Sequence, residues 1–349
     1  MSEKTLQNEL DFGSDNDEEL PPKPVKYMDE NEESESDEDN ISPKKKKSSL
    51  SKKVVKKNNK VKPIIGDRPI SDYIFASVNN YSFKSWKQCF PNDTVTLRSL
   101  IFNPEWDDFF DVIEKKPYFK RIETILSDHL KRNEETIVPH AELVFNSFNI
   151  LSPKKIKVVI VGQDPYPNAA KINGKHIPQA MGFSFSVPFG YPQPPSLEKI
   201  YANLVEFGHF KKIPDGGCLA GWILQGMFMI NASLTTFFCK RNAHRELWKN
   251  FTYDLLAYLN NKCNNLVFLV WGADAHNTCI NIDPYRHHVI TSSHPSPLGF
   301  HQRLSGKTYG KVNNPASYPP FKSTDHFGRM NSYLLSVGKK EIFLDVIDV

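Results

Sequence analysis

An acid, an amide and a histidine each lie at the end of an apolar segment of this sequence. Asp164 follows the run 156–161, Asn231 ends the run 227–231, and His294 follows the run 288–291. A fixed carboxylate can stabilise developing positive charge and orient water, and a fixed donor can stabilise developing negative charge. Asp164 and His294 are candidates for these two roles. Taken singly, Asp164 is better explained as part of an Asp-Pro turn and His294 as a loop cap, and a cap of the next segment is a plausible explanation of Asn231.

A parallel sheet would bring these side chains together. Its predicted strands are 156–161, 227–231, 266–271 and 288–291, and helical periodicity is found at 105–113, 118–129, 196–207, 246–259, 274–280 and 325–337. Strands that alternate with helices are typical of parallel sheets with right-handed crossovers. We therefore predict an α/β fold with three αβα layers around a central four-stranded parallel sheet. Ligand sites of such sheets lie at the carboxyl ends of the strands.

Charge divides the chain into unequal parts. Residues 1–42 hold 15 acids and 3 lysines, residues 43–63 hold 10 lysines and no acid, and the whole chain has a net charge of +4. Few aromatics and strong self-repulsion predict a disordered, acidic-then-basic tail over 1–63. Residues 64–103 are predicted to be an extension that packs on a globular domain at 104–349. The lysines around 44–47 fit a nuclear localisation signal or a nucleic-acid tether, and a solvated linker explains them equally well.

The composition also bears on location and cofactors. The 5 cysteines are scattered, without metal-ligand spacing, so no metal site is expected. There is neither a signal peptide nor an apolar run of membrane-spanning length, so we expect a protein that is not secreted and has no membrane partner.

Four loop segments together resemble one enzyme family, the family 1 uracil-DNA glycosylases. They are Gly162-Gln163-Asp164-Pro165-Tyr166, Gly182-Phe183-Ser184-Phe185-Ser186-Val187, Met229-Ile230-Asn231-Ala232-Ser233-Leu234-Thr235 and His294-Pro295-Ser296-Pro297-Leu298. Shorter matches stand between them in the family's order, at 194–197, 221–222, 269–272 and 286–289, and a helix start at 116–119 fits as well. The resemblance spans 104–337 and implies the uracil-DNA glycosylase fold. It also implies hydrolysis of the N-glycosidic bond of uracil in DNA, without metal or cofactor.

The resemblance assigns roles to residues that would meet the flipped base. Asp164 would stabilise the sugar cation, and His294 would donate, as a neutral imidazole, to a carbonyl oxygen of uracil. Asn231 would read the donor–acceptor edge that distinguishes uracil from cytosine. Phe185 would stack on the base, although core packing is the alternative for it and the preferred explanation of Phe183. Tyr166 would exclude a thymine methyl group, and Gln163 would contact the pyrimidine.

Further residues resemble the family's DNA contacts. Leu298 is similar to an apolar wedge that enters the minor groove and offsets the loss of stacking. Phosphate contacts that position the strand without reading its sequence are expected from Pro194, Pro195, Ser196, Gly272 and Ser296.

Two insertions and one substitution depart from the family pattern. Pro167 stands where cellular members of the family usually carry histidine, and poxvirus relatives also have proline there. The insertion 168–178 contains Lys171, Lys175 and His176, and the insertion 303–320 contains Arg303, Lys307 and Lys311. Both could add electrostatic contacts to DNA, and disordered surface loops are an equal alternative. With the long tail and a lysine- and asparagine-rich composition, Pro167 suggests a large DNA virus or a protist as source.

Two functions of different classes follow. The leading one is a monofunctional glycosylase that starts base excision repair, acting as a monomer on single- or double-stranded DNA that contains uracil. The alternative is a DNA-binding replication accessory module with secondary or lost chemistry, which Pro167 and the insertions leave open. We expect the protein in the nucleus or a viral replication compartment, otherwise in the cytoplasm, where its tail could bind replication or repair proteins.

Overall fold

The centre of the fold is a four-stranded sheet, seen in a computed structural model that describes residues 61–345 except 134, 173 and 306–316. The strand order is β5-β2-β7-β8 and all three neighbouring pairs are parallel, as predicted. The strands are β2 (Val158–Gly162), β5 (Met227–Asn231), β7 (Val267–Trp271) and β8 (His288–Ser292). Every residue of β2 and β7 is buried, which is why these strands are continuous apolar runs in the sequence.

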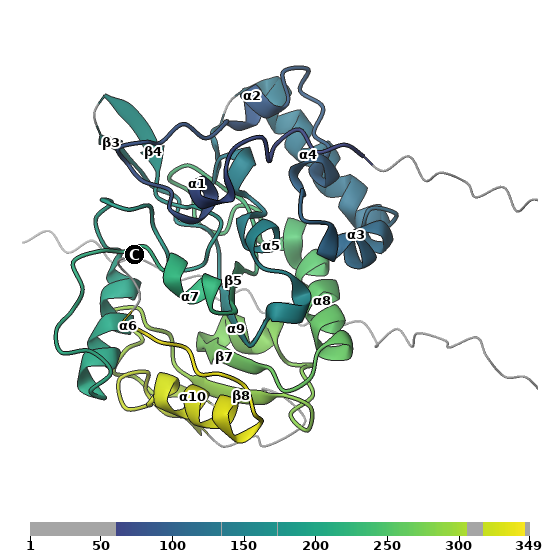
Figure 1. The fold of residues 1–349 in the computed structure, drawn as a ribbon. Helices are drawn as coiled ribbons and strands as arrows, with labels where there is room; N and C mark the ends of the chain where they lie inside the picture. The colour runs from purple at the N-terminus through teal and green to yellow at the C-terminus, as the bar shows by residue number, and fades with distance from the viewer. Residues whose placement is uncertain (1–60, 134, 173, 306–316, 346–349) are drawn as a thin grey trace, which may run out of the picture. The chain divides into compact units, whose positions relative to one another are not determined.

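Helices cover both faces of the sheet. Figure 1 shows α3, α4 and α8 along one side and α6 and α10 on the other, so the three-layer prediction is confirmed. The helices are α1 (Ile70–Ile74), α2 (Trp86–Cys89), α3 (Asp107–Ile113), α4 (Pro117–Arg132), α5 (Asn146–Ile150), α6 (Pro195–Glu206), α7 (Ala220–Leu224), α8 (Arg245–Lys262), α9 (Gly272–Thr278) and α10 (His326–Ser336). Local sequence sets their ends: α4 begins at a proline, which has no N–H to leave unpaired, and ends before Asn133 in the left-handed region.

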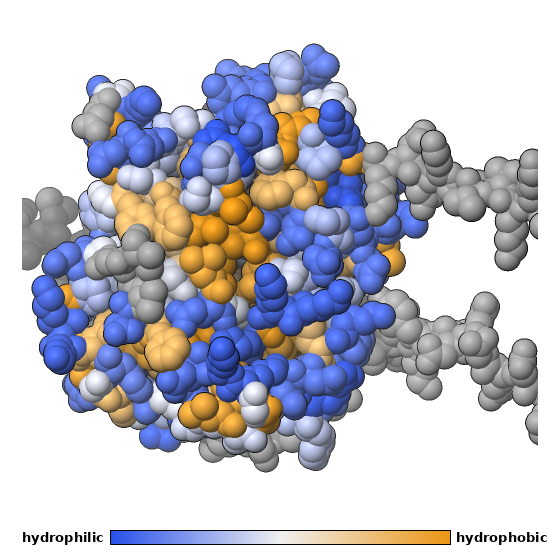
Figure 2. Space-filling view, in the orientation of Figure 1, coloured by the Kyte–Doolittle hydropathy of each residue, from blue (hydrophilic) through white to orange (hydrophobic). Residues whose placement is uncertain are grey.

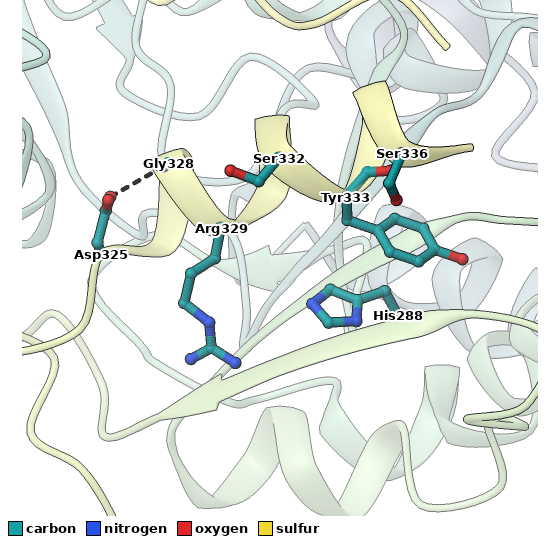
Figure 3. A pocket seen from close by; sticks show the side chains of 7 residues that line it. All are labelled: His288, Asp325, Gly328, Arg329, Ser332, Tyr333 and Ser336. Carbon is teal, nitrogen blue, oxygen red and sulfur yellow. Dashed lines mark hydrogen bonds between the residues drawn. The ribbon is translucent and has the colours of Figure 1, made fainter. Parts of the chain in front are cut away.

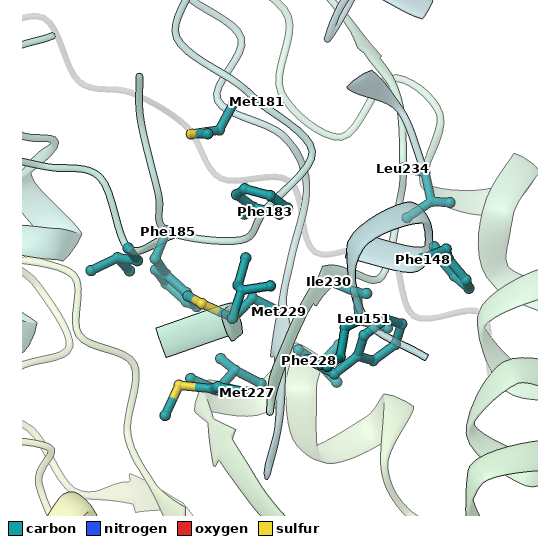
Figure 4. Close-up of a cluster of buried hydrophobic side chains, with 14 of the residues drawn as sticks. Phe148, Leu151, Met181, Phe183, Phe185, Met227, Phe228, Met229, Ile230 and Leu234 are labelled. Atoms are coloured by element: carbon teal, nitrogen blue, oxygen red, sulfur yellow. The ribbon is translucent and has the colours of Figure 1, made fainter. Parts of the chain in front are cut away.

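Aromatic side chains fill the space between the sheet and α3, α5 and α8. Trp106 stacks on Phe228 of β5 with ring centroids 5.3 Å apart, and Phe148 meets the same ring edge-on at 5.2 Å. Figure 4 shows this cluster continuing past Met229 to Phe183 and Phe185. Phe183 is buried, as expected of a core residue. The core therefore extends without interruption to the loop that carries Phe185.

One buried carboxylate joins several parts of the segment 64–103 to the segment 139–149. The side chain of Glu142 is fully buried. The Arg68 guanidinium, the Tyr73 hydroxyl and the Lys84 backbone N–H donate hydrogen bonds to it, at 2.8, 2.9 and 2.6 Å. A buried carboxylate needs such partners, because an unpaired one is strongly destabilising.

In Figure 2, apolar residues gather between α1 and α7 on a surface that is otherwise largely hydrophilic.

Both predicted insertions contain β-hairpin structure. The first forms β3 (Ala169–Ile172) and β4 (Lys175–Pro178), in which Lys171 faces His176 across the pair. The second begins and ends in β9 (Leu304–Ser305) and β10 (Ser317–Tyr318), while Lys307 and Lys311 lie outside the described residues. A further short pair joins β1 (Ile137–Val138) to β6 (Thr236–Phe237). The first insertion is thus a folded hairpin rather than the disordered loop that stood as its alternative.

Residues 1–60 of the predicted tail, which include its lysine cluster, lie outside the described residues. Within the described ranges, no helix is both long and apolar enough to cross a membrane. In the same ranges, no group of three or more histidine, cysteine, aspartate or glutamate side chains is placed to hold a metal ion.

Candidate active site

The predicted catalytic and base-reading residues come from one edge of the sheet. β2 ends at Gly162 beside Asn231, the last residue of β5, and β7 ends at Trp271 beside Ser292, the last residue of β8. Asp164 lies two residues past the end of β2, and His294 lies two residues past the end of β8. Because all four strands are parallel, these side chains share the carboxyl edge, where such sheets place their ligand sites.

Asn231 lies directly over a glycine. A methyl group on Gly162 would be 2.3 Å from the Asn231 Oδ1 atom and 2.9 Å from the Ser184 Cβ atom, so no larger residue fits there. The Asn231 side chain is partly exposed and makes no hydrogen bond to any residue that the structure describes. Its amide donor and acceptor are therefore both available to a ligand, which an asparagine that caps a segment would not offer.

The Asp164 carboxylate is oriented from a second loop. The backbone N–H of Asn242 donates a hydrogen bond of 2.7 Å to its Oδ2 atom, and the N–H of Cys239 donates one of 3.0 Å to the Pro167 carbonyl. Burial raises the pKa of Asp164, while the Asn242 N–H and the charge of Arg241 act in the opposite direction. The acid is thus partly desolvated but keeps a donor that favours its ionised form.

His294 lies in a tightly braced loop. Its Cβ atom would be 2.8 Å from a methyl group on Gly272, whose φ of +86° also favours glycine. The Ser293 hydroxyl donates to the Gly299 carbonyl at 2.8 Å, and the Gly299 N–H donates to the Ser296 hydroxyl at 3.1 Å. Burial lowers the pKa of His294 to about 4. The imidazole is therefore neutral at pH 7 and carries a single N–H donor.

Two aromatic residues complete the group. Phe185 packs edge-on against Trp271 at 5.5 Å and lies 6.1 Å from the His294 ring, centroid to centroid. The Tyr166 hydroxyl donates to the Phe185 carbonyl at 3.4 Å. Phe185 has φ of +64°, uncommon for a residue with a side chain and typical of functional positions. Its segment is a turn rather than an alternating strand, and Gly182 in the same turn also has a positive φ. The Phe185 ring is buried in the hydrophobic core, so core packing and base stacking both remain explanations of it.

Most of the expected DNA contacts lie on two segments, the start of α6 and the loop 293–299 that follows β8, which we call the wedge loop. Leu298 is 83% exposed, as a wedge would be, but exposed leucines are common on protein surfaces, so its role rests on the resemblance. Pro194, Pro195 and Ser196 open α6, and Lys199 on the same helix places its ammonium group 5.4 Å from the ring centroid of Phe300, next to the wedge loop. The Ser296 hydroxyl accepts from Gly299, so its own proton remains available to donate.

Sequence reasoning missed three residues near the acid, namely Asn242, Arg245 and Asp274. The Gln163 side-chain amide donates a hydrogen bond of 2.6 Å to Asp274, which also pairs with Arg245 at 2.6 Å. Asn242 contributes only its backbone. None of these contacts has a local sequence signal, because they join residues 29 to 111 positions apart.

The hollow in Figure 3 is a separate feature. It lies along α10 and is lined by residues such as His288, Arg329 and Tyr333, and none of the predicted site residues lines it. His288 begins β8, whereas the site lies past the other end of that strand.

Comparison with known proteins points to one family. The model of the uracil DNA glycosylase superfamily matches residues 148–316. A probable uracil-DNA glycosylase of Acanthamoeba polyphaga mimivirus is 48% identical over 293 residues, which are 84% of this chain and 78% of the relative. The uracil-DNA glycosylase of Caenorhabditis elegans is 35% identical over 247 residues, 70% of this chain and 84% of the relative. The crystal structure of the mimivirus enzyme aligns with a TM-score of 0.77 at 49% identity, covering 80% of this chain and all of that one.

Proposed function

The chain belongs to the uracil-DNA glycosylases, and from that premise we propose that it excises uracil from DNA by hydrolysing the N-glycosidic bond of a flipped nucleotide. One observation carries the proposal: three groups share one sheet edge, namely an oriented carboxylate, an amide without a hydrogen bond to any described residue, and a neutral imidazole. The similarity to the mimivirus protein also fits a member like those of large DNA viruses. A DNA-binding module without chemistry would need none of these three groups.

In this mechanism the bond between C1′ of the deoxyribose and N1 of the base breaks first. Its electron pair leaves with uracil, and positive charge grows on the sugar. The Asp164 carboxylate stabilises that charge and orients a water molecule, whose oxygen bonds to C1′ and whose proton passes to the carboxylate. The neutral His294 donates a hydrogen bond to a carbonyl oxygen of the departing uracil anion. The carboxylate then releases its proton, the uracil anion takes one up, and the products are free uracil and an abasic site in an unbroken strand.

Base selection follows from hydrogen bonds and shape. The Asn231 amide can accept from N3–H of uracil and donate to O4, a pattern that cytosine reverses. The ring of Tyr166 would occupy the space of a methyl group on C5, which would exclude thymine. Phe185 supplies a stacking surface for the base once it has left the duplex, and Leu298 fills the gap left behind.

The test is a strand-scission assay. The purified protein is incubated with an oligonucleotide containing one uracil, in the presence of a chelator, and abasic sites are then cleaved with alkali. We expect scission only after the alkali step, as for a monofunctional hydrolase without lyase activity. The variants Asp164→Asn and His294→Leu should each lower kcat by about a hundredfold or more. Tight binding of the oligonucleotide without scission by the natural protein would instead support the accessory module.

We also propose that the protein acts as a monomer in the nucleus or a viral replication compartment, with its tail as a site for replication or repair proteins. The lysine cluster around 44–47 is the feature that supports this address. A fluorescent fusion in which Lys44, Lys45, Lys46 and Lys47 are replaced by glutamine should lose nuclear enrichment, and unchanged enrichment would contradict the proposal.

A further inference from the structure

Three cationic residues lie on the segment that orients the acid, and two of them have protein partners. Lys240 forms an ion pair with Glu135, and Arg245 forms one with Asp274. Arg241 is exposed and forms neither an ion pair nor a hydrogen bond through its side chain with any residue in the described part of the chain. Its guanidinium group is therefore the member of this trio that remains available to an anion from outside.

Backbone hydrogen bonds fix where this arginine stands. The next residue, Asn242, donates to the Asp164 carboxylate at 2.7 Å, and Cys239, two residues earlier, donates to the Pro167 carbonyl at 3.0 Å. Arg241 is thus held between two attachments to the loop of the catalytic acid. Its charge also lowers the pKa of His294 and acts in the same direction on Tyr166, so Arg241 lies within electrostatic reach of both.

We propose that Arg241 binds a backbone phosphate next to the extruded nucleotide and so positions the strand over Asp164. The inference rests on the proposed function. A flipped nucleotide brings its flanking phosphates against the loops around the pocket. An arginine presents a planar fork of donors that matches phosphate oxygens, and such charge-assisted bonds are stronger than neutral ones.

The charge of Arg241 is also compatible with the chemistry beside it. It lowers the pKa of Asp164 and of His294, which favours the carboxylate and the neutral imidazole. The arginine therefore serves the acid and the histidine as well as the strand.

The experiment measures kcat and KM on a single-stranded uracil oligonucleotide over a range of salt concentrations. In Arg241→Gln we expect KM to rise about three- to tenfold at low salt, with little change in kcat. The slope of log kcat/KM against log salt should become shallower by about one, because one phosphate contact is lost. Arg241→Lys should recover most of the slope, since it keeps the charge without the planar fork.

Lys154→Gln is the matched control. This lysine is highly exposed, pairs with Glu105 at 3.3 Å and lies just before β2, at the opposite edge of the sheet from the site. Removing its charge should leave the salt slope unchanged. An Arg241→Gln protein with normal thermal stability and the natural slope would overturn the inference. Absence of scission by the natural protein would instead refute the proposed function, so the two failures are distinguishable.

Discussion

The sheet edge and the wedge loop, to which we assign two roles in one proposed reaction, differ in burial and in what holds them. Asp164 and His294 are largely desolvated, and the pKa of each is displaced by burial. Leu298 is 83% exposed, although the loop beneath it is braced by the Ser293 and Ser296 hydroxyl groups. The chemistry therefore depends on an environment that is complete before DNA arrives, whereas the wedge acquires its environment only from DNA. Changes at the edge should alter kcat and selectivity, and changes on the loop should alter binding.

The largest expected effect concerns base selection at the edge. Asn231→Asp removes the amide donor, so excision of uracil should fall by about a thousandfold or more, because the polar edge of the base is left unpaired. A carboxylate at this position can accept from the amino group of cytosine, and a weak cytosine activity should appear. Oligonucleotides with uracil or cytosine at one position measure both. A variant that kept the natural selectivity would show that Asn231 does not read the base.

The pH profile tests the displaced pKa values. Asp164 must be ionised and His294 neutral, and both conditions fail only on acidification. Since the pKa of His294 is lowered to about 4 from an ordinary 6.5, kcat/KM should stay level as the pH falls through 6.5. It should decline at more acidic pH, as Asp164 becomes protonated above its ordinary pKa of 3.8, by about tenfold per pH unit. An acid limb centred near 6.5 would mean that the histidine is not desolvated.

The smallest expected effect belongs to the wedge. Leu298→Ala should lower kcat/KM on double-stranded DNA by about three- to tenfold, because less of the lost stacking is offset. On single-stranded DNA, which has no stacked partner strand to displace, the change should be small. Leu335→Ala, on the exposed side of α10, is a suitable control for the loss of an exposed leucine. Equal losses on both substrates would contradict the wedge role.

The strands and their loops could be predicted because their determinants are local. Buried parallel strands appear as apolar runs, so the predicted run 227–231 coincides with β5 and the run 156–161 overlaps most of β2. The positions of Asp164, Asn231 and His294 at one edge follow from that topology. Their catalytic roles remain predictions that the assays above address.

What the sequence did not predict depends on contacts between distant segments. The Asn242 N–H reaches Asp164 across 78 positions, and Gln163 reaches Asp274 across 111. The turn at Phe185 could not be predicted, because apolar and polar residues alternate over 183–187 as they do in a strand. The positive φ of Phe185 has no signal in the local sequence. The hairpin of β3 and β4 was equally consistent with a surface loop, since only Gly174 marks its turn.

The buried carboxylate of Glu142 has a consequence for how this protein can be shortened, by a protease or in the course of evolution. All three donors to it come from residues 68–84, so a Glu142 that stayed buried without them would carry an uncompensated charge, at a cost of about 3–5 kcal/mol. The same residues pair with the chain just beyond Phe185, since Val78 donates to the Phe189 carbonyl at 2.9 Å. A lineage that discarded this segment would first have to replace Glu142 with an uncharged residue.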